Sequence, residues 1–157
     1  MITLALAVIA VAADPVGWPS YRAGMGRAGY SNQALSFSAT ETWRHDMPAP
    51  SPAWTSPARR SYWQQLEGIL PRVTGDWANH PVADESLVWL GSSADDTVRC
   101  LDAQTGELLW SFAADGPVRY APVLADGRLF FGSDDGSVYC VEAGTGRLVW
   151  RERLGPR

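Results

Sequence analysis

The feature that most constrains the fold is a repeat of about 40 residues in the C-terminal half of the chain. Residues 81–110 read PVADESLVWLGSSADDTVRCLDAQTGELLW, and residues 122–150 read PVLADGRLFFGSDDGSVYCVEAGTGRLVW. The cysteines of the two copies lie 40 residues apart, and so do their closing tryptophans. A repeat of this length is typical of solenoids, propellers and other arrays. The chain is therefore predicted to contain two copies of one module.

Each copy has the periodicity of strands. It contains four short apolar runs rich in β-branched and aromatic residues, separated by turn signals such as Asp126-Gly127 and Gly144-Thr145-Gly146. Four strands in about 40 residues make one blade of a propeller. No segment predicts a convincing helix. We therefore predict an all-β fold, a partial β-propeller of four-stranded antiparallel blades, with two full blades at 78–114 and 115–157 after an N-terminal arm.

The turn before the last strand of each copy resembles a known repeat. Residues 102–110 read DAQTGELLW, and the second copy differs by having Glu142 in the place of Asp102. This pattern resembles the repeat of pyrroloquinoline-quinone-type (PQQ-like) β-propellers, which include quinoprotein alcohol dehydrogenases and a non-catalytic lipoprotein of outer-membrane protein assembly. Residues 18–22 (WPSYR) are similar to the leader of secreted bacterial members. The resemblance implies a propeller fold and a secreted bacterial protein.

Five residues of this repeat are predicted to act structurally rather than in binding. The carboxylate of Asp102 should accept hydrogen bonds from nearby backbone N–H groups, and Gly106 should supply the left-handed residue of the turn. Trp110 should fill the wedge between two twisted sheets and give its indole N–H to a backbone carbonyl. Gly146 and Trp150 repeat the same arrangement one module later.

The chain opens with an apolar stretch, residues 1–13 (MITLALAVIAVAA), that ends in small residues. A membrane span needs about 18 apolar residues, so this stretch is too short for a transmembrane helix. Its small residues suit a signal-peptidase site. We predict a signal peptide, with a buried first strand as the alternative. The expected location is therefore the periplasm or the extracellular space, and an integral membrane protein is not expected.

Residues 14–47 are predicted to form an N-terminal arm. Gly24, Gly26 and Gly29 fit the spacing G-x-G-x-x-G, but neither the strand nor the helix of a dinucleotide site flanks them. Thr40–Met47 (TETWRHDM) is expected to form an isolated strand. The resemblance suggests that this strand closes the ring as the outer strand of a later blade, and a simple edge strand is the alternative.

Residues 48–77 form a Pro- and Trp-rich insertion. Its prolines disfavour a sheet, and loops longer than about 12–15 residues are often functional. We predict a lid whose tryptophans fold back over the blades, with a contact loop whose exposed side chains bind a partner as the alternative. The candidate contact residues are Trp54, Arg59, Arg60 and Trp63.

Charge and cysteine usage exclude several classes of function. The net charge of −4 leaves no basic surface for nucleic acid, so no nucleic-acid partner is expected. All 13 basic residues are Arg, which excludes a P-loop or Schiff-base lysine. Cys100 and Cys140 occupy equivalent positions in adjacent blades, about 10 Å apart by sheet spacing. A disulfide needs Cα atoms closer than about 7 Å, so two free buried thiols are predicted.

Two functions remain open. The first is a non-catalytic propeller portion of an exported protein, which acts as a scaffold for protein or cell-envelope partners. The alternative is the N-terminal part of a PQQ-dependent quinoprotein alcohol dehydrogenase whose catalytic residues lie beyond residue 157. No catalytic, cofactor or metal residue is assigned, and PQQ and Ca²⁺ are implied by the resemblance only. Because propellers close with about four to eight blades, we expect a fragment of a longer propeller or self-association that covers the open faces.

Overall fold

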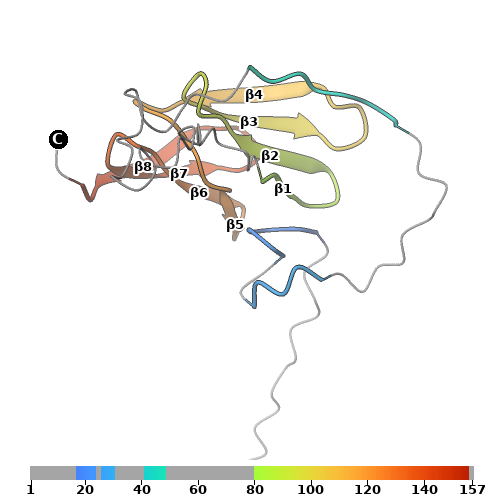
Figure 1. Ribbon diagram of the computed structural model, residues 1–157, viewed down its shortest axis with the longest axis horizontal. Helices are drawn as coiled ribbons and strands as arrows, with labels where there is room; N and C mark the ends of the chain where they lie inside the picture. The colour runs from blue at the N-terminus through green and yellow to red at the C-terminus, as the bar shows by residue number, and fades with distance from the viewer. Residues whose placement is uncertain (1–16, 24–25, 31–40, 49–79, 156–157) are drawn as a thin grey trace, which may run out of the picture.

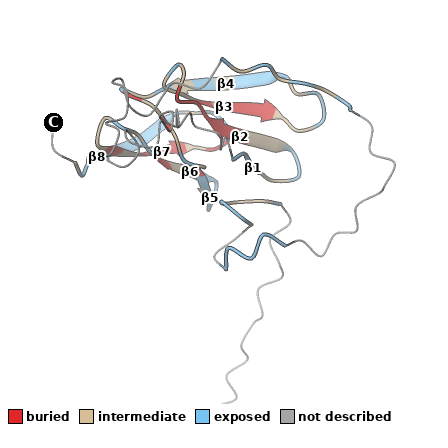
Figure 2. Ribbon diagram, in the orientation of Figure 1, coloured by how far each residue is buried: buried red, intermediate tan, exposed pale blue. Residues whose placement is uncertain are grey.

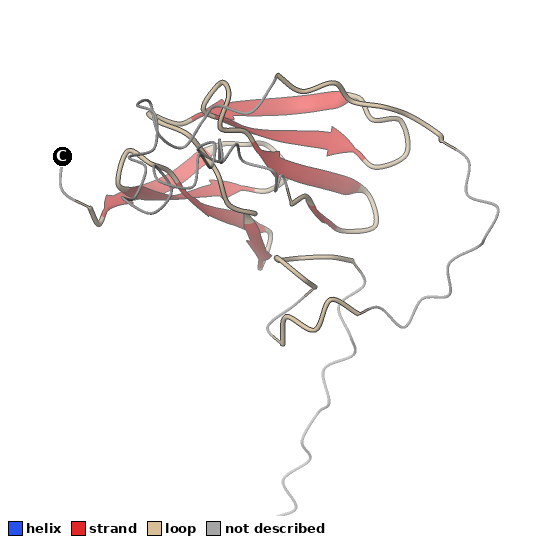
Figure 3. Cartoon of the chain, in the orientation of Figure 1, coloured by secondary structure: helices blue, strands red, loops and turns tan. Residues whose placement is uncertain are grey.

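The computed structural model describes residues 17–23, 26–30, 41–48 and 80–155. Within these residues it contains two four-stranded antiparallel sheets and no helix (Figures 1 and 3). The first sheet has the order β1-β2-β3-β4 and the second has the order β5-β6-β7-β8. This architecture confirms the predicted pair of four-stranded blades. The strands are β1 (Val82–Ala83), β2 (Leu87–Gly91), β3 (Thr97–Asp102), β4 (Leu108–Ala113), β5 (Val123–Ala125), β6 (Arg128–Gly132), β7 (Ser137–Glu142) and β8 (Leu148–Arg153).

The registers of the two sheets are equivalent. One row of paired residues crosses the first sheet through all four strands: Val82, Trp89, Cys100 and Trp110. The corresponding row of the second sheet is Val123, Phe130, Cys140 and Trp150. Side chains of one row point to the same face of a sheet. We call the face that carries each row the front face of its sheet, and the opposite one its back face.

The hydrophobic core lies between the front face of the first sheet and the back face of the second (Figures 1 and 2). Phe112 of the first sheet contacts the rings of Phe131 and Tyr139, with centroids 5.8 and 5.7 Å away. Val118 comes from the connection between the sheets and is also buried. Neither sheet buries this face without its neighbour, as expected of stacked repeats. The main buried members of the seam are Val82, Trp89, Val98, Cys100, Val118, Leu129, Phe131, Tyr139 and Val141.

The N-terminal arm reaches both sheets. Trp18 and Ala83 exchange two backbone hydrogen bonds, and the carbonyl of Pro19 accepts one from the N–H of Leu124. The ring of Tyr21 lies edge-on to that of His80, with centroids 4.5 Å apart. The arm therefore lies across the inner strands β1 and β5.

Residues 41–48 differ from their prediction, because they form no strand. They follow the first sheet as an extended segment beside β4 (teal in Figure 1), and Trp43 holds them there through its side chain. The Trp43 side chain can hold the segment without backbone hydrogen bonds to β4. Residues 41–48 therefore stay extended but form no strand, although their sequence is typical of one.

Several predictions lie outside the described residues. These are the signal peptide at 1–13, most of the insertion at 48–77, and the candidate contact residues Trp54, Arg59, Arg60 and Trp63. In the described part of the chain no helix has the length and hydropathy that a membrane crossing requires.

The two thiols are free and fully buried, which confirms their prediction. Burial raises the pKa of Cys100 to about 12, and the nearby charge of Asp84 adds to the shift. Cys100 therefore stays protonated and packs as a small apolar side chain.

We predict that a thiol reagent modifies neither cysteine in the folded protein and both after unfolding. The reason is that the thiolate is the reactive form and both thiols are fully buried. Intact mass after labelling, with and without urea, measures the outcome. A loss of two hydrogens without reagent, or rapid labelling of the folded chain, would contradict the expectation.

Candidate functional site

The turn at 102–106 is built around one carboxylate. Asp102 Oδ1 accepts hydrogen bonds from the backbone N–H groups of Gln104 (2.9 Å) and Thr105 (2.8 Å), and from the Thr105 hydroxyl (3.1 Å). The bonds from Thr105 and Gln104 hold the pKa of Asp102 below its usual value. Gly106 closes the turn with a φ of 72° and donates its N–H to the Asp102 carbonyl. The turn is thus fixed before any other element contacts it.

The turn at 142–146 has the same backbone and different side-chain contacts. The Gly146 N–H donates to the Glu142 carbonyl, and Gly146 has a φ of 70°. The longer Glu142 side chain accepts hydrogen bonds from the Thr145 hydroxyl and the Arg147 guanidinium. These contacts, Arg147 first, hold the pKa of Glu142 below its usual value. The replacement of Asp by Glu therefore leaves the shape of the turn unchanged.

Each turn receives a tryptophan on its glycine. The Trp110 ring covers Gly146 so closely that a Cβ there would lie 2.6 Å from Cε3, and its Nε1 donates to the Ala143 carbonyl (3.1 Å). The Trp43 ring covers Gly106 in the same way, with 2.5 Å to a Cβ. We call these two structures, residues 102–106 and 142–146, the indole-binding turns.

Trp43 also donates a hydrogen bond to the turn at 102–106. Trp43 Nε1 donates to the carbonyl of Ala103 at 2.9 Å, which is the contact that Trp110 makes with Ala143. The Ala143 carbonyl also accepts the Trp89 indole N–H at 2.9 Å, so two indoles of the first sheet share one oxygen of the second. Sequence analysis placed Trp43 in a possible outer strand of a later blade and did not find its contact with Ala103.

Trp150 occupies the same register as Trp110, opposite a cysteine of the preceding strand. The structure leaves it 41% exposed on the front face of the second sheet, where its described ring contact is Phe130. Every residue of β8 is exposed. Of the five repeat residues, Asp102, Gly106, Trp110 and Gly146 thus lie in indole-binding turns or on them, and Trp150 lies on an open face.

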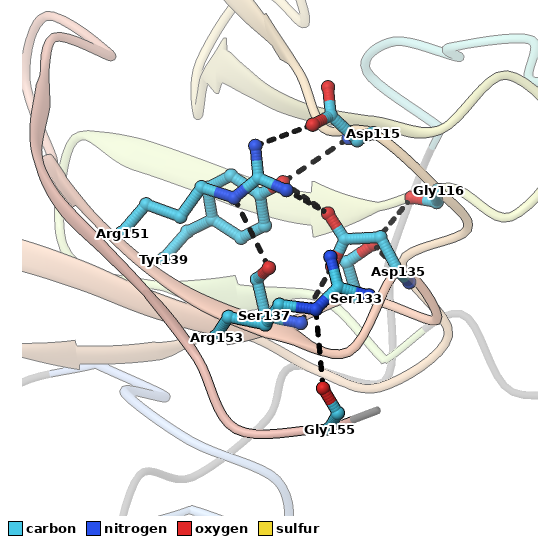
Figure 4. Close-up of polar contacts among 9 residues, drawn as sticks. All are labelled: Asp115, Gly116, Ser133, Asp135, Ser137, Tyr139, Arg151, Arg153 and Gly155. Atoms are coloured by element: carbon cyan, nitrogen blue, oxygen red, sulfur yellow. Dashed lines mark hydrogen bonds and ion pairs between the residues drawn. The ribbon is translucent and has the colours of Figure 1, made fainter. Parts of the chain in front are cut away.

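A polar cluster occupies the other end of the second sheet (Figure 4). The Tyr139 hydroxyl donates to Asp135 and accepts the N–H of Asp115. The Arg151 guanidinium bridges Asp135 and Asp115, and it lies 5.0 Å above the Tyr139 ring. Its Nε also donates to the Ser137 hydroxyl. The cluster ties β7 and β8 to the connection that arrives from the first sheet.

The pKa values of this cluster show which groups are charged. Burial opposes the ionisation of Asp135, but hydrogen bonds from Tyr139 and Ser137 and the charge of Arg151 outweigh it and lower the pKa. Burial raises the pKa of Tyr139, and its hydrogen bond to Asp135 adds to the rise. Tyr139 is therefore a neutral hydrogen-bond donor at neutral pH, and Asp135 is a charged acceptor. We call this cluster of Asp115, Asp135, Ser137, Tyr139 and Arg151 the clasp.

Groups that could serve a redox cofactor or a metal are few in the described part of the chain. Its two thiols are buried in separate sheets, and the carboxylates of Asp102, Asp135 and Glu142 are held in the hydrogen bonds described above. Among residues 17–23, 26–30, 41–48 and 80–155, no three His, Cys, Asp or Glu side chains lie close enough together to hold a metal ion.

Comparison with known proteins gives a family and a fold. A family model described as outer membrane protein assembly factor BamB matches residues 33–157. No curated protein matches the chain.

Many solved structures are similar to it, among them a dehydrogenase and a BamB protein. Quinohemoprotein alcohol dehydrogenase from Comamonas testosteroni has 17% identity over 92% of this chain and 20% of its own, with a TM-score of 0.63. BamB from Moraxella catarrhalis has 17% identity over 45% of this chain and 21% of its own, with a TM-score of 0.42. The first likeness shows the propeller fold. The chain spans about a fifth of the length of these two structures.

Three glycine-to-alanine variants separate the indole contact from backbone strain. Gly146 has a positive φ, and the Trp110 ring occupies the place of a Cβ. Gly146→Ala should therefore lower the free energy of unfolding by about 3 kcal/mol. Gly127→Ala has the same φ of 70° with nothing within 4 Å, and should cost about 1 kcal/mol. Gly144→Ala has neither problem and should stay within about 0.5 kcal/mol of the parent. Urea unfolding measures all three. Equal losses for Gly146→Ala and Gly127→Ala would show that the ring contact contributes nothing.

The clasp predicts a pH dependence of stability. A carboxylate with a pKa below its unfolded value of about 3.9 stabilises the fold above that pH, and the contribution is lost as pH falls through the folded pKa. Asp135→Asn should therefore unfold more easily than the parent at pH 7, by about 1–3 kcal/mol, and lose less stability between pH 5 and about 3. Asp115→Asn, whose parent side chain is 66% exposed, is the matched control and should change little. Parallel pH profiles of parent and Asp135→Asn would contradict the assignment.

Proposed function

The chain belongs to the family of outer membrane protein assembly factor BamB, and on this premise we propose that it acts as a non-catalytic propeller scaffold. In this role the repeats hold loops and sheet faces in place for protein or cell-envelope partners. The protein is exported, to the periplasm or the extracellular space. The apolar stretch at 1–13 and membership of a family described as an outer membrane protein assembly factor support export.

The observation that carries the proposal is the repeated indole contact. Trp43 and Trp110 bind two successive turns through the same pair of contacts, a ring on glycine and an indole N–H on an alanine carbonyl. The motif of Asp, Gly and Trp thus serves to join neighbouring units. Side chains used in this way position surfaces rather than react with a substrate.

The reactive groups of the two sheets support the same role. Asp135, Tyr139 and Arg151 saturate one another in the clasp, and Cys100 is held as a neutral thiol inside the seam. A catalytic acid, base or nucleophile needs a pKa near the working pH and access to a substrate. The pKa of Asp135 is lowered, and those of Tyr139 and Cys100 are raised, so all three move further from neutral pH.

Reconstitution with quinone tests the proposal against its main alternative, a portion of a quinone-dependent alcohol dehydrogenase. We expect the 157-residue chain, incubated with pyrroloquinoline quinone and Ca²⁺ and then desalted, to retain no quinone absorbance. We also expect dye reduction with primary alcohols to equal that of a sample without quinone. The reason is that the carboxylates of Asp102, Asp115 and Asp135 are already bonded in the turn and the clasp, and both thiols are buried.

The outcome against the scaffold role is equally clear. The scaffold proposal would be wrong if the chain retained the quinone stoichiometrically and reduced the dye in the presence of alcohol, and if a chelator abolished that activity. The dehydrogenase function would then take its place. The Cys100→Ala variant is the control for nonspecific reaction of quinone with this thiol. Removal of the Cys100 thiol should leave the clasp and both turns intact.

A further inference from the structure

One end of the seam between the two sheets is not filled by side chains. A groove of about 410 Å³ lies there, where the N-terminal arm meets β1 and β5. It separates the front face of the first sheet from the back face of the second. We call this space the seam groove. Its apolar lining consists of Pro19, Leu87, Trp89, Leu124, Ala125 and Ala143.

The walls of the seam groove are held in place by backbone hydrogen bonds between its segments. The carbonyl of Pro19 in the arm accepts the N–H of Leu124, and the N–H of Ala143 donates to the carbonyl of Gly127. The Ala143 carbonyl in turn accepts the indole N–H of Trp89 at 2.9 Å. The groove is therefore formed without a ligand, which lowers the ordering cost of binding one.

The groove has room for side chains of a partner and is open to solvent. An engineered cavity of about 150 Å³ holds a benzene molecule, so the seam groove holds about two side chains. Ala125, Gly127 and Gly144 line it and are exposed, and its apolar residues Leu87 and Leu124 are half-buried. A partner that covered these two leucines would remove further apolar area from water.

Both ionisable residues that line the groove are acidic, one from each sheet. Asp84 lies in the β1–β2 turn and Asp126 in the β5–β6 turn. Asp84 Oδ1 accepts the N–H groups of Ser86 and Leu87, each at 2.8 Å, and its other oxygen accepts no hydrogen bond within the described residues. The exposed carboxylate of Asp126 has no hydrogen bond or ion pair in the same part of the chain. The groove thus presents acceptors that are not yet used.

The surrounding charges leave the groove acidic. Arg128 follows Asp126 closely in sequence, but it points to the front face of the second sheet, opposite Glu142. There its charge contributes to the lowered pKa of Glu142, after the stronger contacts of Arg147 and Thr145. No basic residue is among the described residues that line the groove.

We propose that the seam groove binds an extended segment of a protein partner in which an apolar side chain stands next to arginine or lysine. The apolar side chain packs on Leu87 and Leu124, and the cationic groups pair with Asp84 and Asp126 on the two walls. A neutral segment would leave both carboxylates without a counter-charge, and an acidic segment would be repelled. The inference rests on the proposed scaffold role and deepens it by naming a binding surface and the chemistry of its partner.

A titration observed by nuclear magnetic resonance tests the proposal with the whole 157-residue chain. The probe is the peptide N-acetyl-Arg-Leu-Arg-amide, in about 150 mM salt, which screens the general attraction to a chain of net charge −4 beyond about 8 Å. The backbone amide signals of Leu87, Leu124, Gly127 and Gly144 and the indole signal of Trp89 should move together. They should give one dissociation constant of about 1 mM.

Asp126→Asn and Asp96→Asn form a matched pair of variants. Both aspartates have a positive φ, 49° and 58°, which asparagine also tolerates, and each substitution removes one negative charge. Asp126 lines the groove, whereas Asp96 lies between β2 and β3 at the opposite end of the first sheet. Asp126→Asn should weaken binding about threefold, and Asp96→Asn should leave it unchanged.

Asp84→Asn tests the other wall. Asparagine keeps an oxygen that can accept the bonds from Ser86 and Leu87, so the turn should persist while its charge is lost. This substitution should weaken binding about fivefold. The dispersion of the amide signals shows whether each variant is folded.

Two control peptides separate charge from apolar contact. N-acetyl-Glu-Leu-Glu-amide should move none of the groove signals, and N-acetyl-Arg-Ser-Arg-amide should bind about fivefold more weakly than the probe. Equal binding of the probe and the glutamate peptide would contradict the charge assignment.

Three further results would overturn the proposal. The first is the absence of shifts at the groove up to about 10 mM probe. The second is equal weakening by Asp126→Asn and Asp96→Asn. The third is movement of the groove signals with the concentration of the chain itself, without peptide, which would assign the groove to a second copy. The quinone assay does not depend on any of these results, so the groove and the scaffold role can fail separately.

Discussion

The contact between an indole ring and a glycine turn is the interaction on which the rest of this structure depends. A flat ring can lie directly on the backbone at Gly106 and Gly146 only because no Cβ is present, and both glycines also supply the left-handed φ that closes the turn. The ring buries apolar area while its N–H donates to a backbone carbonyl of the same turn. One side chain thereby fixes both the distance and the register between two sheets.

The clasp at the far end of the second sheet complements this contact. The indoles of Trp89 and Trp110 hold one end of the seam through the Ala143 carbonyl, and Arg151 holds the other end through Asp115 and Asp135. Two attachments at opposite ends of a twisted sheet restrict both sliding and rotation against its neighbour. The apolar residues between them can then pack in a single arrangement.

The sequence allowed most of the fold to be predicted and only part of the site. Strand periodicity and Gly-rich turns are local signals, so all eight strands and their grouping into two sheets followed from them. The position of Trp43 did not, because its contact with Ala103 joins residues 60 apart and needs no strand at residues 41–48. The clasp was missed for the same reason. Asp135 looks like an ordinary turn residue until Tyr139 and Arg151 are brought to it by the pairing of β7 and β8.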